Sequence, residues 1–236
     1  MLTAGLGPIM NLLAVDTTSR YGSVALLTGG ELRGEVRLVE SGAHSRTLFP
    51  AIELLLRVAG LAPGDVDAYA AAVGPGSFTG VRIGVSTVQG LALASGRPVL
   101  GLTSLEALAG RMQGAAGALV AMVDAYRDQV YVAVYDGADL RERVAPVAVT
   151  PEAWLADAPA GAAFLGDGAL KYREQIRALR PDAVFPDKSL FLASTIARLA
   201  APRLARGEGH EAAALRPVYL RAPDIRPAAP AASPVR

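Results

Sequence analysis

The stretch LLAVDTTSRYGSVALLTGGELRGEVRL, residues 12–38, sets the fold class of this 236-residue chain. It opens with a short apolar run that ends at Asp16, and a second apolar run over residues 21–27 follows a polar turn. Charged and apolar residues then alternate over residues 31–38, which is the period-two pattern of a strand with one solvated face. The stretch therefore predicts an antiparallel meander of three strands.

The same pattern returns 108 residues later in the chain. Asp124 stands at the position of Asp16, and Val132 stands at that of Val24. No gap is needed across the meander, which favours an internal duplication over a chance likeness. The sequence therefore predicts two similar halves.

The region between the two repeats alternates between helix and strand. Apolar residues at helical spacing predict helices over residues 48–59 and 81–94, and short apolar runs predict strands over 67–73 and 99–102. The fold class is therefore α/β, with mixed sheets flanked by helices. The second half is sparser and is predicted to be reduced. Its expected elements are helices over residues 151–155, 169–179 and 190–205 and a strand over 163–165.

A glycine-rich stretch over residues 110–117 predicts the boundary between the halves. We divide the chain into an N-terminal half, residues 1–113, and a C-terminal half, residues 114–221. Residues 1–9 precede Met10 and are interpreted as a non-essential extension or a start-site artefact. Residues 222–236 are rich in proline and alanine without apolar periodicity, which predicts a flexible tail.

Composition excludes several classes of protein. The chain has no cysteine, which excludes disulfides, thiolate metal sites and cysteine nucleophiles. Its net charge is only +1, so no strongly basic surface marks it as a nucleic-acid binder. The apolar runs are too short to span a membrane, and the N-terminus lacks the basic region of a signal peptide. These features predict a cytoplasmic protein with no membrane partner.

The longest motif is GPGSFTGVRIGV, residues 74–85. Its first glycines permit a sharp bend, and Ser77 or Thr79 can cap the helix that follows. Gly80 and Gly84 lie one helical turn apart and leave a smooth stripe along that helix. The residues alone leave open whether the chain's own sheet or a partner helix packs against this stripe.

This motif resembles the TsaB family, the dimerization subunits of the bacterial tRNA threonylcarbamoyladenosine-37 (t6A37) synthase. The segments LAVDT, residues 13–17, and PVYLR, residues 217–221, add to the resemblance. The first half matches nearly throughout, whereas the second half matches only at Asp124, the GDG of residues 166–168 and the segment around Tyr219. The resemblance implies the actin-like ATPase (ASKHA) fold, built from two ribonuclease-H-like halves.

The resemblance also implies a non-catalytic scaffold subunit that pairs with and activates the catalytic subunit TsaD. The ATPase TsaE joins that pair, and tRNA is bound through the complex. Whether the free chain forms a homodimer is left open. Two apolar helices in the first half could supply half of an intermolecular four-helix bundle. The residues predicted to form this partner interface are Leu48, Phe49, Ile52, Leu56, Gly80, Val81, Gly84, Val85 and Val88, with Phe49, Leu56 and Val88 facing outward.

Residues needed for catalysis are missing by the same comparison. The TsaD family carries a His-x-x-x-His pair that holds the active metal, but here His44 is followed four positions later by Leu48. We therefore predict no catalytic residue and no metal site. The turns after Asp16 and Asp124 lack the glycine that lets backbone amides wrap a phosphate. We expect no intrinsic cofactor, with nucleotide only at the interface of the complex, and both aspartates closing turns.

Two other functions compete with the scaffold role. An independent actin-like ATPase or small-molecule kinase would show tight ATP binding by the isolated chain. A metalloprotease of the glycoprotease type would retain metal after purification. The sequence contains neither a His-Glu-x-x-His motif nor a paired-histidine site, so the sites for both alternatives are absent.

Overall fold

The computed structural model describes residues 10–39 and 44–221, so the predicted extension and tail lie outside the described residues. The first sheet has the order β3-β2-β1-β4-β5. Its first three strands form the predicted antiparallel meander, and β4 and β5 extend the sheet in parallel. The strands are β1 Asn11–Asp16, β2 Tyr21–Thr28, β3 Glu31–Val39, β4 Ala68–Ala72 and β5 Val99–Leu102.

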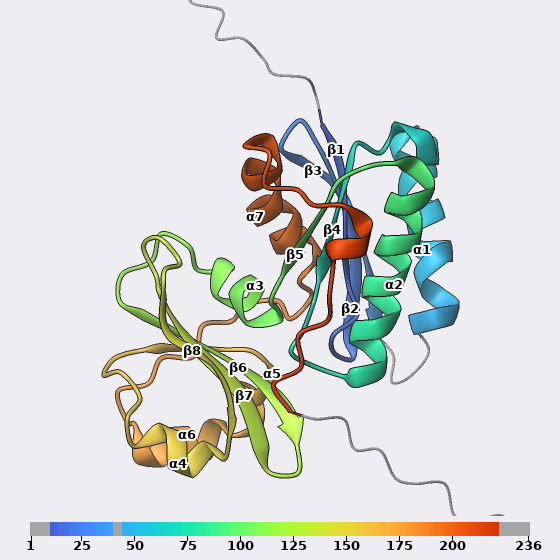
Figure 1. Cartoon of the computed structure of the whole chain (residues 1–236). Helices are drawn as coiled ribbons and strands as arrows, with labels where there is room; N and C mark the ends of the chain where they lie inside the picture. Colours follow the sequence, from blue (N-terminus) through green and yellow to red (C-terminus); the bar gives the residue numbers. More distant parts are fainter. Residues whose placement is uncertain (1–9, 40–43, 222–236) are drawn as a thin grey trace, which may run out of the picture.

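Helices cover both faces of this sheet (Figure 1). The helices α1, His44–Ala59, and α2, Phe78–Ser95, lie on one face, and α3, Ser104–Gly110, and α7, Ala193–Ala205, lie on the other side. Successive side chains of β1 point to opposite faces of the sheet, so the strand contributes to the apolar core on each face. Leu13 points toward α1 and α2, whereas Leu12 points into the core shared with α3 and α7. A strand buried on both faces reads as a continuous apolar run, as β1 does.

The second sheet repeats this plan with one strand fewer, in the order β8-β7-β6-β9. Its meander is again antiparallel, and β9 pairs with β6 in parallel. The predicted α/β class and the reduced second half are both confirmed. The predicted helix over 169–179 is interrupted at Tyr172, which separates α5 from α6. The elements are β6 Ala118–Tyr126, β7 Gln129–Asp136, β8 Glu142–Val149, α4 Pro151–Leu155, β9 Ala163–Leu165, α5 Asp167–Lys171 and α6 Arg173–Leu179.

The predicted ungapped register between the halves is wrong along β6. Val24 of β2 pairs with Val15, and its repeat Val132 should therefore pair with Val123. Val132 pairs instead with Met122, one residue earlier. A β-bulge near the end of β6 accounts for the displacement, because it adds one residue to one strand only. Both faces of β6 are apolar, so the sequence pattern gives no sign of the shift.

The end of the described chain returns to the first half (Figure 1). Val99 and His210 exchange two backbone hydrogen bonds, of 2.9 and 2.8 Å, and Val218 N–H donates to the Val73 carbonyl at 2.7 Å. The 3-10 turn η2, Ala212–Ala214, packs beside α2. A division at residue 113 thus follows the order of elements along the chain, whereas α7 and residues 206–221 pack on the first sheet.

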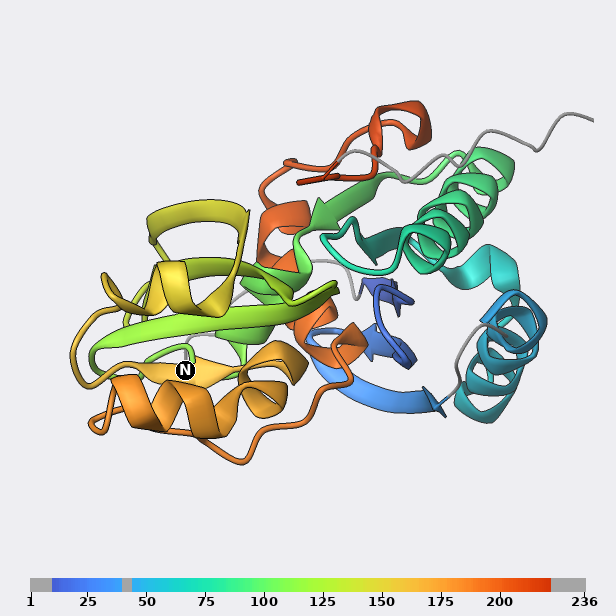
Figure 2. The same cartoon turned by 90° about the horizontal axis from the view of Figure 1, so that it is seen from below.

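One apolar core joins the two halves, which lie side by side in Figure 2. It contains Ala14 of β1, Ala121 of β6 and Ile196 of α7, so both sheets and α7 share buried surface. No helix within residues 10–39 and 44–221 is both long and apolar enough to cross a membrane.

Alanine substitutions at two glycines of α2 should change the free energy of unfolding in opposite directions. A Cβ at Gly80 would lie 2.0 Å from the Thr17 carbonyl oxygen, whereas a Cβ at Gly90 would meet nothing within 4 Å. Gly80→Ala should lower the free energy of unfolding by about 2 kcal/mol or more, because the helix must move off the sheet. Gly90→Ala should raise it by about 0.5–1 kcal/mol, because alanine favours helix. Urea unfolding of both variants measures this, and a neutral Gly80→Ala would contradict the close packing.

Candidate functional site

Two hollows in the described surface coincide with regions singled out by the sequence. A groove of about 670 Å³ lies between α1, α2 and the short turn η1, Pro63–Asp65. A cleft of about 510 Å³ lies between the two halves, where Thr18 and Ser19 of the first half approach Asp124 of the second. The groove is the candidate partner site, and the cleft lies beside the turn after Asp16 and the strand end at Asp124 that the sequence analysis examined for phosphate binding.

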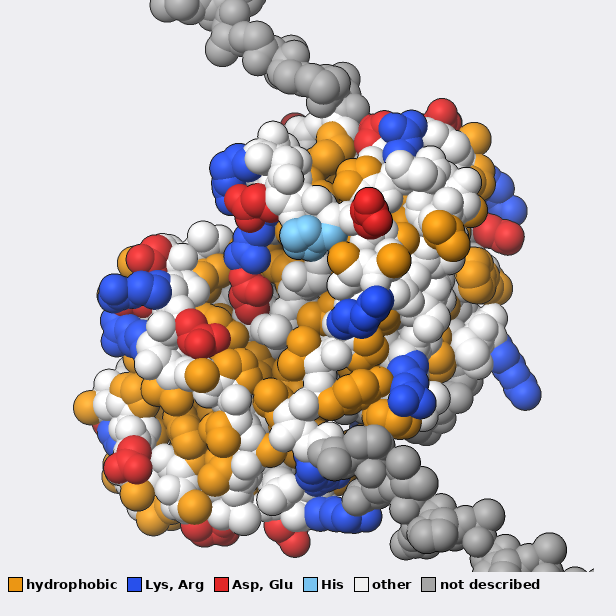
Figure 3. Space-filling view, in the orientation of Figure 1, with side chains coloured by type: hydrophobic (Ala, Val, Ile, Leu, Met, Phe, Trp, Pro, Cys, Tyr) orange, Lys and Arg blue, Asp and Glu red, His pale blue; other side chains and the backbone are white. Residues whose placement is uncertain are grey.

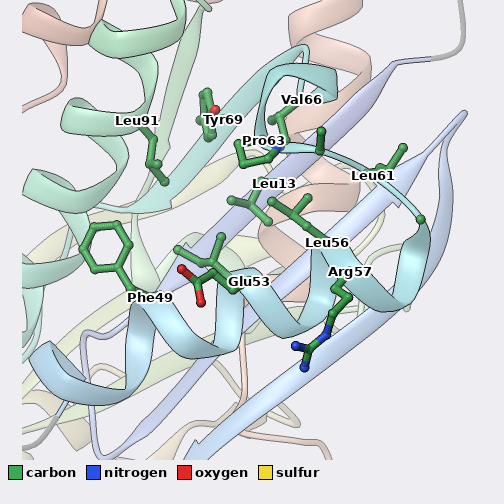
Figure 4. Close-up of a pocket in the computed structure, with 13 residues that line it drawn as sticks. Leu13, Phe49, Glu53, Leu56, Arg57, Leu61, Pro63, Val66, Tyr69 and Leu91 are labelled. Atoms are coloured by element: carbon green, nitrogen blue, oxygen red, sulfur yellow. The ribbon is translucent and has the colours of Figure 1, made fainter.

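The groove is apolar and is open to solvent (Figure 4). Phe49 of α1 and Leu91 of α2 lie at one end, and Leu61 lies toward the other. Charge enters only through α1, whose Glu53 and Arg57 also line it. An apolar groove between two helices suits an incoming apolar helix face.

The structure buries most of the predicted interface residues in the chain's own core. Phe49 is 50% exposed, as predicted for an outward position. Leu56 is 5% exposed and Val88 is 0% exposed, so the predicted outward orientation of these two residues is wrong. The other buried members are Leu48, Ile52, Gly80, Val81, Gly84 and Val85. Of these buried residues, only Ile52 and Leu56 line the groove, and an outside partner could not reach most of the others.

The glycine stripe faces the chain's own sheet. A Cβ at Gly84 would lie 2.5 Å from Thr17 Oγ1, and Thr17 Oγ1 donates a hydrogen bond to the Gly80 carbonyl at 2.6 Å. The stripe therefore allows α2 to approach the end of β1, as close helix–strand packing commonly requires. The alternative of a partner helix on Gly80 and Gly84 is thereby excluded.

Sequence reasoning missed the residues that α1 and α2 do expose. Leu93 of α2 is 78% exposed, and Gly90 leaves open space beside it. On α1 the exposed apolar side chains include Leu54 and Val58 as well as Phe49. Apolar residues occur on more than one side of each helix, so helical spacing alone does not show which side is buried. The exposed position of Gly90 is visible only once the helix rotation is known.

Asp16 closes the turn after β1, as predicted. Its Oδ1 accepts hydrogen bonds from Thr18 N–H at 2.9 Å and from Thr18 Oγ1 at 2.7 Å. Complete burial raises the pKa of Asp16 to about 6, against the opposing effect of these hydrogen bonds. Its Oδ2 is buried and accepts no hydrogen bond among the described residues.

Asp124 makes a similar local contact two residues before the end of β6, across the bulge of that strand rather than in the turn after it. Its Oδ1 accepts from Tyr126 N–H at 3.1 Å, and its two oxygens lie 3.0 and 3.1 Å from Lys171 Nζ. The neighbouring Asp167 accepts from Asp124 N–H at 3.1 Å. Burial raises the pKa of Asp167, and the Asp124 charge adds to the effect. The carboxylates of the second half are therefore engaged by protein groups.

His44 is the first residue of α1, which confirms its interpretation as a helix-start residue. Its Nε2 lies 2.9 Å from the Ser19 carbonyl oxygen, which can only accept, so Nε2–H donates. The imidazole lies against Gly22, where a Cβ would come within 2.6 Å of the ring. His44 therefore fastens α1 to the turn between β1 and β2. Within the described ranges, no three His, Cys, Asp or Glu side chains converge in a metal-binding arrangement.

Known proteins resemble this chain in both sequence and structure. A family model described as TsaD: tRNA N6-adenosine threonylcarbamoyltransferase matches residues 36–205. The tRNA threonylcarbamoyladenosine biosynthesis protein TsaB of Escherichia coli is 38% identical over 129 residues, 53% of this chain. The solved structure of YeaZ from Pseudomonas aeruginosa is 38% identical with a TM-score of 0.79, and the match covers 90% of this chain and 100% of that one. The chain belongs to the TsaB family.

The chain spans only about half of the length of the curated TsaB proteins that it matches. The matches to the Escherichia coli, Haemophilus influenzae and Bacillus subtilis proteins cover 55, 52 and 60% of their lengths. An uncharacterized protein of Mycobacterium tuberculosis matches more fully, at 32% identity over 226 residues, or 94% of this chain and 96% of that protein. The predicted TsaB resemblance and its two-sheet fold are confirmed.

Asp16 should make the stability of this TsaB chain depend on pH. Its pKa is higher in the folded chain, at about 6, than the ordinary 3.8, so ionisation opposes folding. Below about pH 4 the ionisation of Asp16 does not reduce the free energy of unfolding. The reduction grows as the pH rises from the unfolded to the folded pKa, and it is complete above about pH 6. Asp16→Asn stays neutral and should gain on the order of 3 kcal/mol relative to the parent between about pH 4 and pH 7. Urea unfolding of both proteins across this range measures the gain, and a pH-independent difference would contradict it.

Proposed function

We propose that this TsaB chain is a non-catalytic scaffold subunit in tRNA threonylcarbamoyladenosine biosynthesis, which pairs with and activates a TsaD-type catalytic chain. The names of its relatives support the pathway. The observation that carries the pairing is the α1–α2 face, where an apolar groove of about 670 Å³ holds the half-exposed ring of Phe49. Such a surface costs free energy while it faces water and favours association.

The geometry of this face suits a partner helix. Phe49 at one end of the groove would serve as an aromatic anchor, since aromatic residues in well-packed pockets carry much of the energy of an interface. The open space at Gly90 would let a helix approach α2 closely. The partner is a TsaD-type chain because this chain itself matches the TsaD family model, so related first halves can pair through equivalent helices. The four helices would form an intermolecular bundle.

The non-catalytic role is supported by what the carboxylates already do. Asp16 and Asp124 each accept a hydrogen bond from the backbone two residues further on, and Lys171 neutralises Asp124. These are the aspartates that an actin-like ATPase would use to hold metal and phosphate. The chemistry is therefore assigned to the TsaD-type partner, with the TsaE ATPase and tRNA joining the assembled pair, and with nucleotide held only where the chains meet.

Truncating Phe49 should weaken partner binding without unfolding the chain. Because Phe49 is half exposed, Phe49→Ser should leave the melting temperature within a few degrees and raise the Kd for the TsaD-type chain about tenfold or more. The matched control is Leu179→Ser, since Leu179 is 53% exposed on α6 of the other half. Isothermal calorimetry measures both, and equal Kd values for the two variants would place the interface elsewhere. Val88→Arg, in the core, should instead unfold the chain.

The isolated chain should neither turn over ATP nor retain stoichiometric metal. Within residues 10–39 and 44–221 no three His, Cys, Asp or Glu side chains converge on an ion, and the carboxylate of Asp124 is already paired with Lys171. A phosphate-release assay and elemental analysis of the purified chain measure this. Turnover at about 1 s⁻¹ or faster, or one tightly held transition metal per chain, would favour the ATPase or metalloprotease alternatives instead.

A further inference from the structure

The hairpin between β6 and β7 holds three consecutive side-chain-bearing residues in the left-handed region of backbone space. Tyr126, Arg127 and Asp128 have φ values of 58, 52 and 55°. Tyr126 pairs with Gln129, so Arg127 and Asp128 form a two-residue turn that needs positive φ at both positions. Such turns favour Asn-Gly, because Cβ clashes with the backbone in this region. Aspartate tolerates the conformation, whereas tyrosine and arginine do so at a cost.

Packing does not offset the strain at Tyr126. Its side chain is 64% exposed, while its amide is held by Asp124 Oδ1 at 3.1 Å. The residue lines the mouth of the cleft between the halves, together with Ser19, Arg20 and Ser77. Backbone strain that neighbouring residues maintain, and that no side-chain packing offsets, is typical of residues that bind a ligand.

Basic residues lie near this mouth, although its lining also contains the carboxylates of Asp124 and Asp167. Arg20 lines the cleft itself, and Arg127 is on the hairpin beside Tyr126. Arg221, at the end of the described chain, donates to Gln129 at 3.1 Å on the same hairpin. Figure 3 shows Lys and Arg side chains gathered at the lower end of the seam between the halves, near this hairpin. The nearby Asp124 is neutralised by Lys171.

A second aromatic group lies on the Ser77 side of the cleft. The guanidinium of Arg82 stacks 3.8 Å from the centre of the Phe78 ring, and its Nε donates to Tyr219 Oη at 3.0 Å. Phe78 and Tyr219 are themselves 5.2 Å apart between ring centres. Phe78 follows Ser77 directly, so this stack flanks the cleft that Tyr126 lines on the other side. Aromatic rings interleaved with arginines are the usual platform for unpaired nucleotides.

We propose that the cleft mouth is a contact surface for a single-stranded loop of RNA. Tyr126 stacks on an unpaired base, and Arg20 and Arg82 bind the flanking phosphates. A paired duplex does not fit, because its bases are stacked on one another and cannot reach an aromatic ring. The inference rests on the proposed role in tRNA modification and names where this chain would touch that tRNA. The small net charge of the chain does not exclude it, since the contact needs only the few basic residues near the cleft.

The test uses the full chain, alone and with its TsaD-type partner, at low salt. The probes are an RNA hairpin with an unpaired loop, an RNA duplex of the same length, and ATP, with binding followed by fluorescence anisotropy. Tyr126→Asn is the decisive variant, because asparagine tolerates the left-handed backbone and removes only the ring. Tyr126→Phe keeps the ring and is its matched control. Arg20→Gln tests a phosphate contact.

Tyr126→Asn should weaken binding of the loop RNA about tenfold and leave the melting temperature equal or higher, whereas Tyr126→Phe should bind like the parent. Arg20→Gln should lower the slope of log K against log salt by about 0.7. The proposal is overturned if Tyr126→Asn binds loop RNA normally, if the duplex binds as well as the loop, or if neither the chain nor the pair binds loop RNA. Competition by ATP would show a nucleotide site instead. Phe49→Ser separates the two proposals, because it should impair pairing with the partner while loop binding by the free chain persists.

Discussion

The close approach of α2 to the end of β1 is the contact on which the rest of the structure depends. Gly80 and Gly84 let the helix backbone come down onto Thr17, whose hydroxyl donates to the Gly80 carbonyl at 2.6 Å. This contact fixes the rotation of α2, which puts Val85 and Val88 into the core and turns Leu93 outward. It also places Ser77, the N-cap of α2, at the cleft between the halves. Both functional surfaces are therefore consequences of one packing contact.

The polar groups of the cleft between the halves hold the fold together. Asp16 ends β1 and Asp124 lies two residues before the end of β6, and each accepts a hydrogen bond from the backbone two residues further on. Their surroundings differ. Asp16 is buried with a raised pKa, whereas Asp124 is paired with Lys171 and stays near solvent. A fold can retain its shape while its function moves to another surface, because shape depends on packing and function on a few side chains.

The sequence predicted the strands, the main helices and the turn chemistry because these depend on local pattern. The meander around Asp16 and the helix-start role of His44 follow from residues close together in the chain. The orientation of α2 could not be predicted, because apolar residues occur on several of its sides and only contact with Thr17 selects one. The bulge of β6 was equally hidden, since a one-residue shift in a strand that is buried on both faces leaves the apolar pattern unchanged.

The two surfaces on α2 also explain why the end of the chain returns to the first half. Tyr219 rests on Phe78 in the first turn of the helix, and Gln89 in its middle donates to the Leu215 carbonyl at 2.9 Å. The returning segment thus contacts a second side of α2. None of the residues of this segment lines the groove between α1 and α2. A helix that is fixed by the sheet at Gly80 and by this segment at Gln89 cannot rotate. Its outward side, with Gly90, is therefore held in place before any partner binds, which would lower the entropy cost of the proposed association.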